Sequence, residues 1–109
     1  MKIEELVERY TYRVEWSEED GTHIAKCAEL PSLAAHGEKA TKAIGELEKV
    51  VIETLKWMEE EGEDIPAALS TRKYKGNLTL RVPSDIHRKL TIESSEQGVS
   101  INQLILSKL

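Results

Sequence analysis

Residues 76–84, GNLTLRVPS, are the stretch on which the fold of the C-terminal part of the chain depends. Aliphatic and polar residues alternate along it, and this period of two is typical of a strand with one buried face. Pro83 lacks a backbone N–H group and is therefore expected to end the strand. The aliphatic residues are Leu78, Leu80 and Val82, and the polar residues between them are Asn77, Thr79 and Arg81.

Two short helices are expected after this strand. Ser84 is predicted to be the N-cap of the first helix, and Gly98 is predicted to end it. Ser100 is predicted to be the N-cap of the second helix. An apolar stripe runs along both helices, and it contains Ile86, Leu90, Ile101, Leu104, Ile105 and Leu109.

A lone strand in front of two short helices leaves its backbone edge unpaired and cannot bury its apolar face. Two copies of the chain meet both requirements when their strands pair antiparallel over the four helices. The sequence therefore predicts a homodimer or a higher homo-oligomer. The predicted dimer core consists of Leu78, Leu80, Val82, Leu90, Leu104 and Ile105.

The polar face of such a paired ribbon is suited to double-stranded DNA. A two-stranded ribbon fits the major groove, where Arg suits guanine, Asn suits adenine and Thr suits either bases or the thymine methyl group. Asn77, Thr79 and Arg81 are therefore predicted to read bases, with a polar face exposed only to water as the alternative. The predicted phosphate contacts are Lys73 and Lys75 together with the start of the second helix at Ser100, Ile101 and Asn102.

The charge of the chain is divided unevenly. Residues 1–71 hold eight Lys or Arg and seventeen Asp or Glu, which gives −9. Residues 72–109 hold seven Lys or Arg and three Asp or Glu, which gives +4. Such a split predicts two functional halves with partners of opposite charge, and chance clustering of surface charge is the alternative.

The first half of the chain begins with strand patterns. Residues 10–16 alternate as a half-buried strand, and a polar turn ending in Gly21 leads to a returning strand over residues 22–28. In the returning strand Ile24 and Ala28 are expected to point inward. Residues 33–36 predict a short third strand.

A long helix is expected next. Apolar residues recur at helical spacing from Ala40 to Met58, whereas Ile52 lies off this stripe, and Gly62 is the expected C-cap. Lys39 precedes the helix as a poor N-cap. The region after Gly62 contains Pro66 and predicts a linker, with one further strand at residues 68–71. The predicted class is α+β, with three strands followed by a helix and that further strand.

The composition excludes several classes of protein. With 39% hydrophobic and 32% charged residues in 109 positions, the chain suits a soluble globular protein. The single cysteine, Cys27, rules out an internal disulfide and fits a reducing cytoplasm. No apolar run approaches the roughly 20 residues that span a bilayer. The three histidines share no metal-ligand spacing with each other or with Cys27, so neither a metal site nor a cofactor is expected.

Residues 76–109 resemble the ribbon-helix-helix (Arc/CopG-like) DNA-binding domains. The similarity rests on the strand that ends in Arg81-x-Pro83 and on the turn Gly98-x-Ser100-x-Asn102. Over residues 10–109 the chain resembles the HicB antitoxin family of type II toxin–antitoxin systems. The stretches that carry this wider resemblance are YRVEWSEEDGTHIAKCAELPSL (12–33), GEDIP (62–66), YKGNLTLRVPSDIHRKL (74–90) and GVSINQLILSKL (98–109).

The resemblance to HicB implies a non-enzymatic antitoxin with two domains. Residues 1–65 would form a toxin-binding domain with a partial ribonuclease-H-like fold, residues 66–75 a linker, and residues 76–109 the ribbon-helix-helix domain. One implied partner is a HicA-type toxin, a small basic protein that cleaves mRNA with a catalytic His. The other is the operator DNA of the operon, which the antitoxin would repress. The candidate toxin contacts are Trp16, Glu18, Glu19, Asp20 and Ile52, and a solvated run of charges is the alternative for the acidic residues among them.

Two other functions fit parts of the sequence. Residues 86–106 are also compatible with a helix-turn-helix regulator, in which Gln103 rather than Asn77 or Thr79 would set sequence preference. A metal-dependent ribonuclease is the alternative from a different class, with Glu15 and Asp20 as its candidate carboxylates. Such nucleases need several carboxylates converging on Mg²⁺, and the first half of the chain has no acidic cluster at strand spacing.

Overall fold

The computed structural model describes residues 2–109, and the chain divides into two compact units between Lys73 and Tyr74. The first unit contains helix α1 (Ile3–Arg9), strands β1 (Tyr12–Ser17), β2 (Thr22–Cys27) and β3 (Leu30–Gly37), helix α2 (Ala40–Glu60) and the short 3-10 helix η1 (Leu69–Thr71). The second unit contains helices α3 (Ser84–Gln97) and α4 (Ile101–Ser107). The α+β class is confirmed, whereas the ribonuclease-H-like and ribbon-helix-helix assignments stay predictions. None of the helices in the described residues is long and apolar enough to cross a membrane.

Helix α1 was not foreseen from the sequence. Its residues Ile3, Leu6 and Val7 follow helical spacing and pack on the core of the first unit. Tyr10, predicted to begin the first strand, instead lies just beyond the end of α1. Its ring is buried, and its hydroxyl donates a hydrogen bond of 2.6 Å to the carbonyl oxygen of Pro66. Burial raises the pKa of Tyr10 to about 12, with smaller contributions from Cys27 and Glu29.

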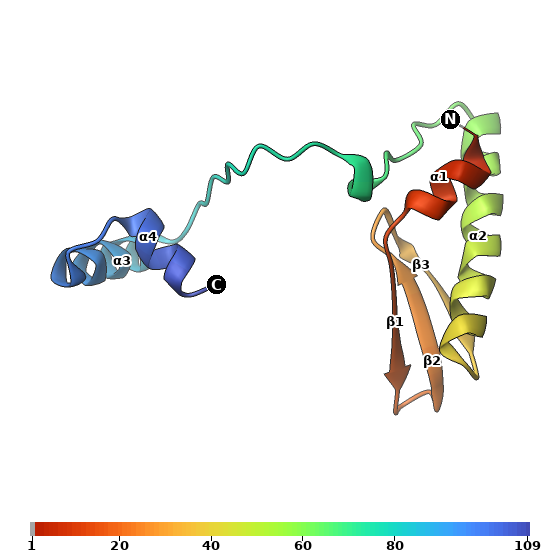
Figure 1. Ribbon diagram of the computed structural model, residues 1–109, viewed down its shortest axis with the longest axis horizontal. Helices are drawn as coiled ribbons and strands as arrows, with labels where there is room; N and C mark the ends of the chain where they lie inside the picture. The colour runs from red at the N-terminus through yellow and green to blue at the C-terminus, as the bar shows by residue number, and fades with distance from the viewer. Residues whose placement is uncertain (1) are drawn as a thin grey trace. The chain divides into compact units, whose positions relative to one another are not determined.

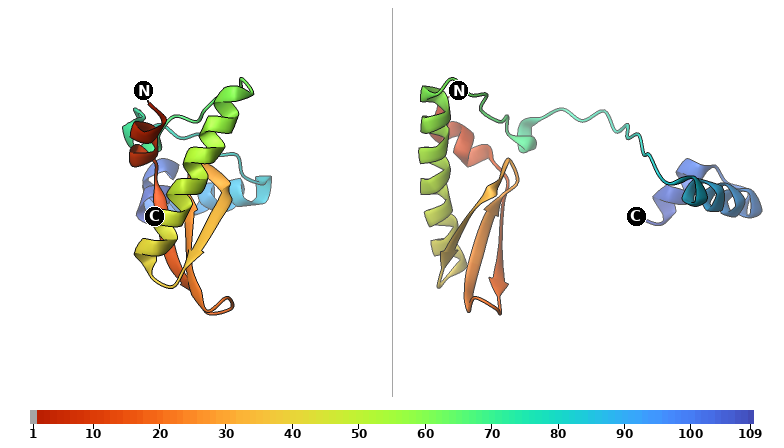
Figure 2. Two further views of the ribbon diagram at one scale, coloured as in Figure 1. Left: turned by 90° about the vertical axis from the view of Figure 1, so that its right-hand side faces the viewer. Right: turned by 180° about the vertical axis from the view of Figure 1, so that it is seen from behind.

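The three strands form an antiparallel sheet in the order β1-β2-β3, and α2 covers one of its faces (Figures 1 and 2). The register pairs Val14 with Ala25, and Ala25 with Ala35, so these residues share the face under the helix. The prediction that Ile24 and Ala28 point inward was wrong, because β2 has the opposite parity and buries Ala25 and Cys27. The third strand is longer than predicted, from Leu30 to Gly37.

The start of α2 lies very close to the end of β3. A Cβ atom added to Gly37 would lie 2.5 Å from the backbone nitrogen of Ala43, so only glycine allows this approach. Helix α2 begins after Lys39, which makes no side-chain cap hydrogen bond, in agreement with the poor cap expected there. The start of α2 is therefore held by close backbone packing against Gly37 and not by a side-chain cap.

The apolar stripe predicted for α2 is confirmed. Ala43, Leu47, Val51 and Leu55 are fully buried against the sheet. Gly62 adopts a φ of +71°, and the N–H groups of Gly62 and Glu63 donate to the carbonyl oxygens of Glu59 and Met58, at 3.2 and 2.9 Å. This pattern is the Schellman motif that a glycine after a helix predicts.

The segment after α2 packs on the first unit. The strand predicted over residues 68–71 is wrong, because residues 69–71 form the 3-10 helix η1 and no strand of the sheet lies beside them. Ala68 is 2% exposed and belongs to the same core as α2. The hydroxyl of Ser70 donates to the carbonyl oxygen of Arg9, at 2.5 Å.

Glu29 joins three separate segments of the first unit. Its carboxylate accepts hydrogen bonds from the backbone N–H groups of Thr11 (2.8 Å) and Leu69 (2.9 Å) and from the Thr11 hydroxyl (3.2 Å). Burial raises the pKa of Glu29, but these hydrogen bonds favour the ionised form and leave the pKa below its usual value. We refer to the contacts of Glu29, Tyr10 and Ser70 with their partners as the seam.

The second unit is small. Gly98 ends α3 with a φ of +69°, as predicted, whereas Ser84 is the first helical residue rather than the N-cap, which is Pro83. Ser100 caps α4 as predicted, because its side chain accepts from the Gln103 N–H and the Gln103 side chain accepts from the Ser100 N–H, both at 3.0 Å. Among the described apolar side chains of this unit, Leu104 alone is buried. The unit therefore has almost no core of its own.

The seam leads to a testable expectation for Glu29→Ala. The substitution leaves the N–H groups of Thr11 and Leu69 without their acceptor and should lower the free energy of unfolding by about 1–3 kcal/mol. The ionised carboxylate stabilises the fold above the unfolded pKa, and this contribution is lost as the pH falls through the lower, folded pKa. Urea unfolding at a series of pH values measures both effects. Glu53→Ala, which replaces an exposed glutamate of α2, is the control. A loss of stability that does not shrink at acid pH would contradict the role of the Glu29 charge.

Candidate nucleic-acid interface and partner surfaces

The segment that contains the predicted strand has no partner within the described chain. Residues 77–83 carry no regular secondary structure. Leu78 is 88% exposed, Leu80 62% and Val82 41%. Exposure of three aliphatic residues in one short segment is costly in water, since each would gain about 1.5–3 kcal/mol on full burial. The pairing of this segment with a second copy stays a prediction.

The same segment borders an apolar groove in the second unit. The groove has a volume of about 970 Å³ and lies between residues 76–82 and the helices α3 and α4. Five of the six residues predicted for the dimer core line it, and the sixth, Leu104, is buried in the unit itself. Leu106 was not foreseen as a lining residue. The apolar lining comprises Leu78, Leu80, Val82, Leu90, Ile101, Ile105, Leu106 and Leu109.

The predicted base-reading residues lie on the exposed segment beside this groove. Asn77, Thr79 and Arg81 are all exposed, and Asn77 and Arg81 also contribute to the rim of the groove. Lys73 and Lys75, the predicted phosphate contacts, are exposed on the connection between the two units. These side chains are accessible to a ligand, although no ribbon forms from a single copy.

The capping box at the start of α4 concerns two predictions, the phosphate contact at residues 100–102 and the helix-turn-helix alternative that relies on Gln103. The N–H groups of Ile101 and Asn102 belong to the first helical turn, which has no carbonyl partner inside a helix. Their role as phosphate contacts stays a prediction. The side-chain oxygen of Gln103, in contrast, is engaged with the Ser100 N–H. This hydrogen bond opposes the helix-turn-helix alternative, which requires Gln103 to be free to read a base.

The first unit carries the candidate toxin contacts at its β1–β2 turn. Trp16 is 51% exposed, and its ring lies 5.2 Å from that of His23 in an edge-to-face arrangement. The Ser17 hydroxyl and the Asp20 carboxylate are 3.1 Å apart and close the turn that carries Glu18 and Glu19. The structure therefore groups Trp16 with three exposed carboxylates.

Ile52 does not belong to that group. It is partly buried and packs on the core of the first unit, so the expectation that it lies off the apolar stripe was wrong. Helix α2 contacts α1 as well as the sheet, so its apolar residues have more than one surface to pack on. Ile52 remains a predicted toxin contact only through its partly exposed atoms.

The carboxylates of the first unit do not converge. Among residues 2–109 no three His, Cys, Asp or Glu side chains are placed to hold a metal ion. Glu15 lies 3.6 Å from Arg13 on the strand, whereas Asp20 binds the turn through Ser17. Glu15 and Asp20, the candidate carboxylates of the nuclease alternative, thus contact different neighbours and do not share a site.

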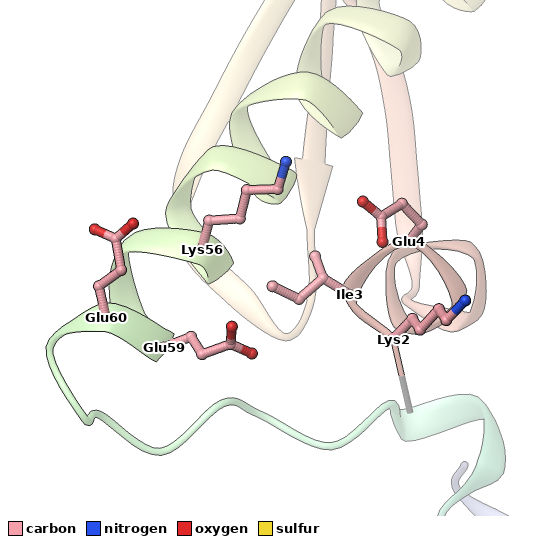
Figure 3. Close-up of a pocket in the computed structure, with 6 residues that line it drawn as sticks. All are labelled: Lys2, Ile3, Glu4, Lys56, Glu59 and Glu60. Atoms are coloured by element: carbon pink, nitrogen blue, oxygen red, sulfur yellow. The ribbon is translucent and has the colours of Figure 1, made fainter.

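A shallow hollow of about 470 Å³ lies between α1 and the end of α2. Figure 3 shows Ile3 at its centre, with Lys56, Glu59 and Glu60 on α2, Glu4 on α1 and Lys2 just before α1. Apart from Ile3 these side chains are exposed and of both signs. Such a hollow has the character of a solvated surface rather than of a ligand site, which is usually concave and mostly apolar.

The groove generates a test of self-association. Leu80→Glu places a charge in the apolar groove and should weaken the homodimer of the full chain at least 100-fold. Two copies of Leu80 lose their burial, worth about 1.5–3 kcal/mol each, and 1.4 kcal/mol corresponds to tenfold. Sedimentation equilibrium gives the dissociation constants. Thr79→Glu introduces the same charge on the neighbouring residue, which does not line the groove, and should leave the dimer within about threefold of the unmodified chain. Equal effects of the two variants would contradict the assignment of the groove.

Comparison with known proteins adds one finding to this geometry. No curated protein and no solved structure matches the chain significantly. Residues 59–109 match the model of the HicB family. The matched part begins in the last turn of α2 and includes the exposed segment, the groove and both helices of the second unit. The similarity to the HicB family that this match shows is confined to the C-terminal part of the chain, residues 59–109.

Proposed function

We propose that this protein is the antitoxin of a HicA–HicB pair, which neutralises the toxin with its first unit and represses its own operon with its second. The HicB family has a toxin–antitoxin-associated role and is associated with a HicA toxin partner. The observation that carries the proposal is the family match, because it covers the entire second unit. The proposed activity is binding, without catalysis.

The second unit supports the operator-binding part of the proposal. Its exposed segment alternates Leu78, Leu80 and Val82 with residues whose side chains suit base edges. The three aliphatic residues border a groove that a second copy would fill. Paired antiparallel, two segments form a ribbon whose two-fold symmetry would match a palindromic operator.

The first unit supports the toxin-binding part. Its sequence, residues 1–73, holds ten Lys or Arg and seventeen Asp or Glu. A net negative unit attracts a basic protein and accelerates the encounter with it, whereas it repels nucleic acid. Neutralisation would then follow from steric and electrostatic occlusion of the RNA-cleaving surface of the toxin. The two units thus divide the proposed tasks by charge.

Arg81→Ala tests the division of labour. The variant should lose at least tenfold in operator affinity, since one good bidentate Arg–guanine contact is worth about 1–3 kcal/mol and the dimer contains two. Toxin neutralisation should be unchanged because Arg81 lies in the second unit. Gel-shift titrations with the promoter DNA of the operon, together with growth rescue from the toxin, measure the two effects.

Arg13→Ala is the matched control, because it removes an exposed arginine from the first unit. It should leave operator affinity within about twofold. If Arg81→Ala and Arg13→Ala bind the operator equally well, the ribbon does not read the DNA. If neither the unmodified chain nor the variants protect cells from the toxin, the antitoxin assignment fails.

A further inference from the structure

The two tryptophans of the chain are both half exposed. Trp16 is 51% and Trp57 53% exposed, in a protein that has no phenylalanine. Trp16 differs from Trp57 in that a described contact holds its ring in place. His23 packs against it edge to face, and Nδ1 of His23 lies 3.1 Å from the carbonyl oxygen of Glu38. An exposed aromatic ring that is already ordered loses little entropy on binding, which is the property of an interface anchor.

Trp16 lies beside a part of the sheet that α2 covers incompletely. The helix packs mainly on β3 and β2 and least on β1. Val14 and Trp16 have the parity of the helix-facing side, yet Val14 is only partly buried. Glu48 of α2 lies close enough to Tyr12 of β1 to contribute to its raised pKa, after burial and Cys27. Glu48 thus lies within electrostatic range of the Tyr12 side chain, which extends from β1.

Gly45 lies on the same side of α2 as Glu48, three residues before it. Glycine is the poorest helix former after proline, and it occupies the interior of a 21-residue helix here. The packing of the first unit does not require it, since a Cβ atom added at Gly45 would meet nothing within 4 Å. A glycine that the unit itself does not need allows the backbone of another molecule to approach the helix closely. Ile44, four residues before Glu48, is partly buried against the core. We refer to Val14, Trp16, Ile44, Gly45 and Glu48 as the β1 flank.

The charges around the β1 flank select its occupant. The closed turn next to Trp16 presents Glu18, Glu19 and Asp20, all exposed. On the helix, Gly45 has the exposed Glu48 on one side and the exposed Lys42 and Lys49 on the other, so the acidic border lies at the Trp16 end of the flank. Tryptophan is the aromatic side chain that best binds a guanidinium or ammonium group over its ring face. An apolar strip with an anchored tryptophan and a carboxylate border fits a basic protein surface and disfavours RNA.

We propose that the β1 flank seats a basic protein partner, with an arginine or lysine of the partner on Trp16 and partner backbone against Gly45. The inference rests on the proposed function, in which that partner is the HicA-type toxin. It assigns the contact to the β1 side of α2 and includes Gly45 and Glu48, which sequence reasoning did not select. Trp57 lies outside the site, because nine residues, about two and a half turns, place it on the opposite side of α2 from Glu48.

The test uses the full chain and the toxin encoded beside it, with the catalytic His of the toxin replaced by Ala so that it can be produced. Isothermal titration calorimetry measures the affinity, and thermal unfolding is recorded for each variant. Trp16→Ala should weaken toxin binding at least 30-fold, as expected for a central anchor. Gly45→Gln should weaken it at least tenfold while raising the thermal midpoint by about 2–5 °C, since glutamine is the better helix former.

Two variants serve as controls. Trp57→Ala removes the other half-exposed tryptophan, and Glu53→Gln changes an exposed residue elsewhere on α2. Both should bind the toxin within threefold of the unmodified chain. Equal affinity of Gly45→Gln and the unmodified chain, or a larger loss for Trp57→Ala than for Trp16→Ala, would overturn the proposed surface and leave the antitoxin assignment standing. Failure of the unmodified chain to bind the toxin would overturn both.

Discussion

The unpaired backbone of residues 77–82 is the constraint on which the second unit depends. Within a single chain, the backbone N–H and C=O groups of this segment have no neighbouring strand, and its aliphatic side chains stay exposed to water. Leu104 is the one buried apolar residue that the two helices supply among themselves. This unit therefore buries little apolar surface by itself, and the predicted dimer would complete its core. The interpretation of the segment as part of a symmetric ribbon follows from this physical need as much as from the family resemblance.

The first unit presents the opposite situation. The helix-facing side of its sheet, the stripe of α2 and the buried Val7 and Ala68 form one contiguous core. Its backbone connections are closed by the Schellman end of α2 and by the seam at Glu29. Two features stay uncovered: Trp16, whose ring is half exposed although His23 packs against it, and Gly45, whose missing Cβ would meet no atom within 4 Å. The first unit is thus a complete fold apart from one confined, incompletely covered flank.

Helical spacing was the most reliable guide to this fold. The stripe of α2 and the caps at Gly62, Gly98 and Ser100 were predictable because each depends on residues within a few positions of one another. The parity of β2 was not, since alternation in THIAKC is weak and the register with β1 decides which residues turn inward. Helix α1 is only seven residues long, too short to be stable without the tertiary contacts that the sequence does not display. Similarly, helical spacing placed Ile52 off the apolar stripe, but Ile52 packs on the core in the structure, where α2 contacts α1 as well as the sheet.

The site residues were predictable to different extents for the same reason. The alternation of residues 77–82 identifies a polar set and an aliphatic set without any knowledge of the rest of the chain. Gly45 carries no such signal, because its importance appears only when the empty space around it is known. Trp16 was recognisable as an exposed aromatic residue near acidic ones, whereas its ordering by His23 depends on cross-strand register.

The seam has a consequence for the order in which the protein is completed during synthesis. Its hydrogen bonds join residues far apart in the chain, with separations of 40 residues for Glu29 and Leu69, 56 for Tyr10 and Pro66, and 61 for Arg9 and Ser70. Chains are synthesised from the N-terminus, so the sheet and α2 leave the ribosome before the residues that fasten them. A nascent chain that ends with α2 contains all three strands of the sheet, but it lacks Pro66, Leu69 and Ser70, with which Tyr10, Glu29 and Arg9 form hydrogen bonds. The first unit is therefore complete only when residues 66–70 have emerged, and a fragment cut at residue 65 would lack these hydrogen bonds permanently.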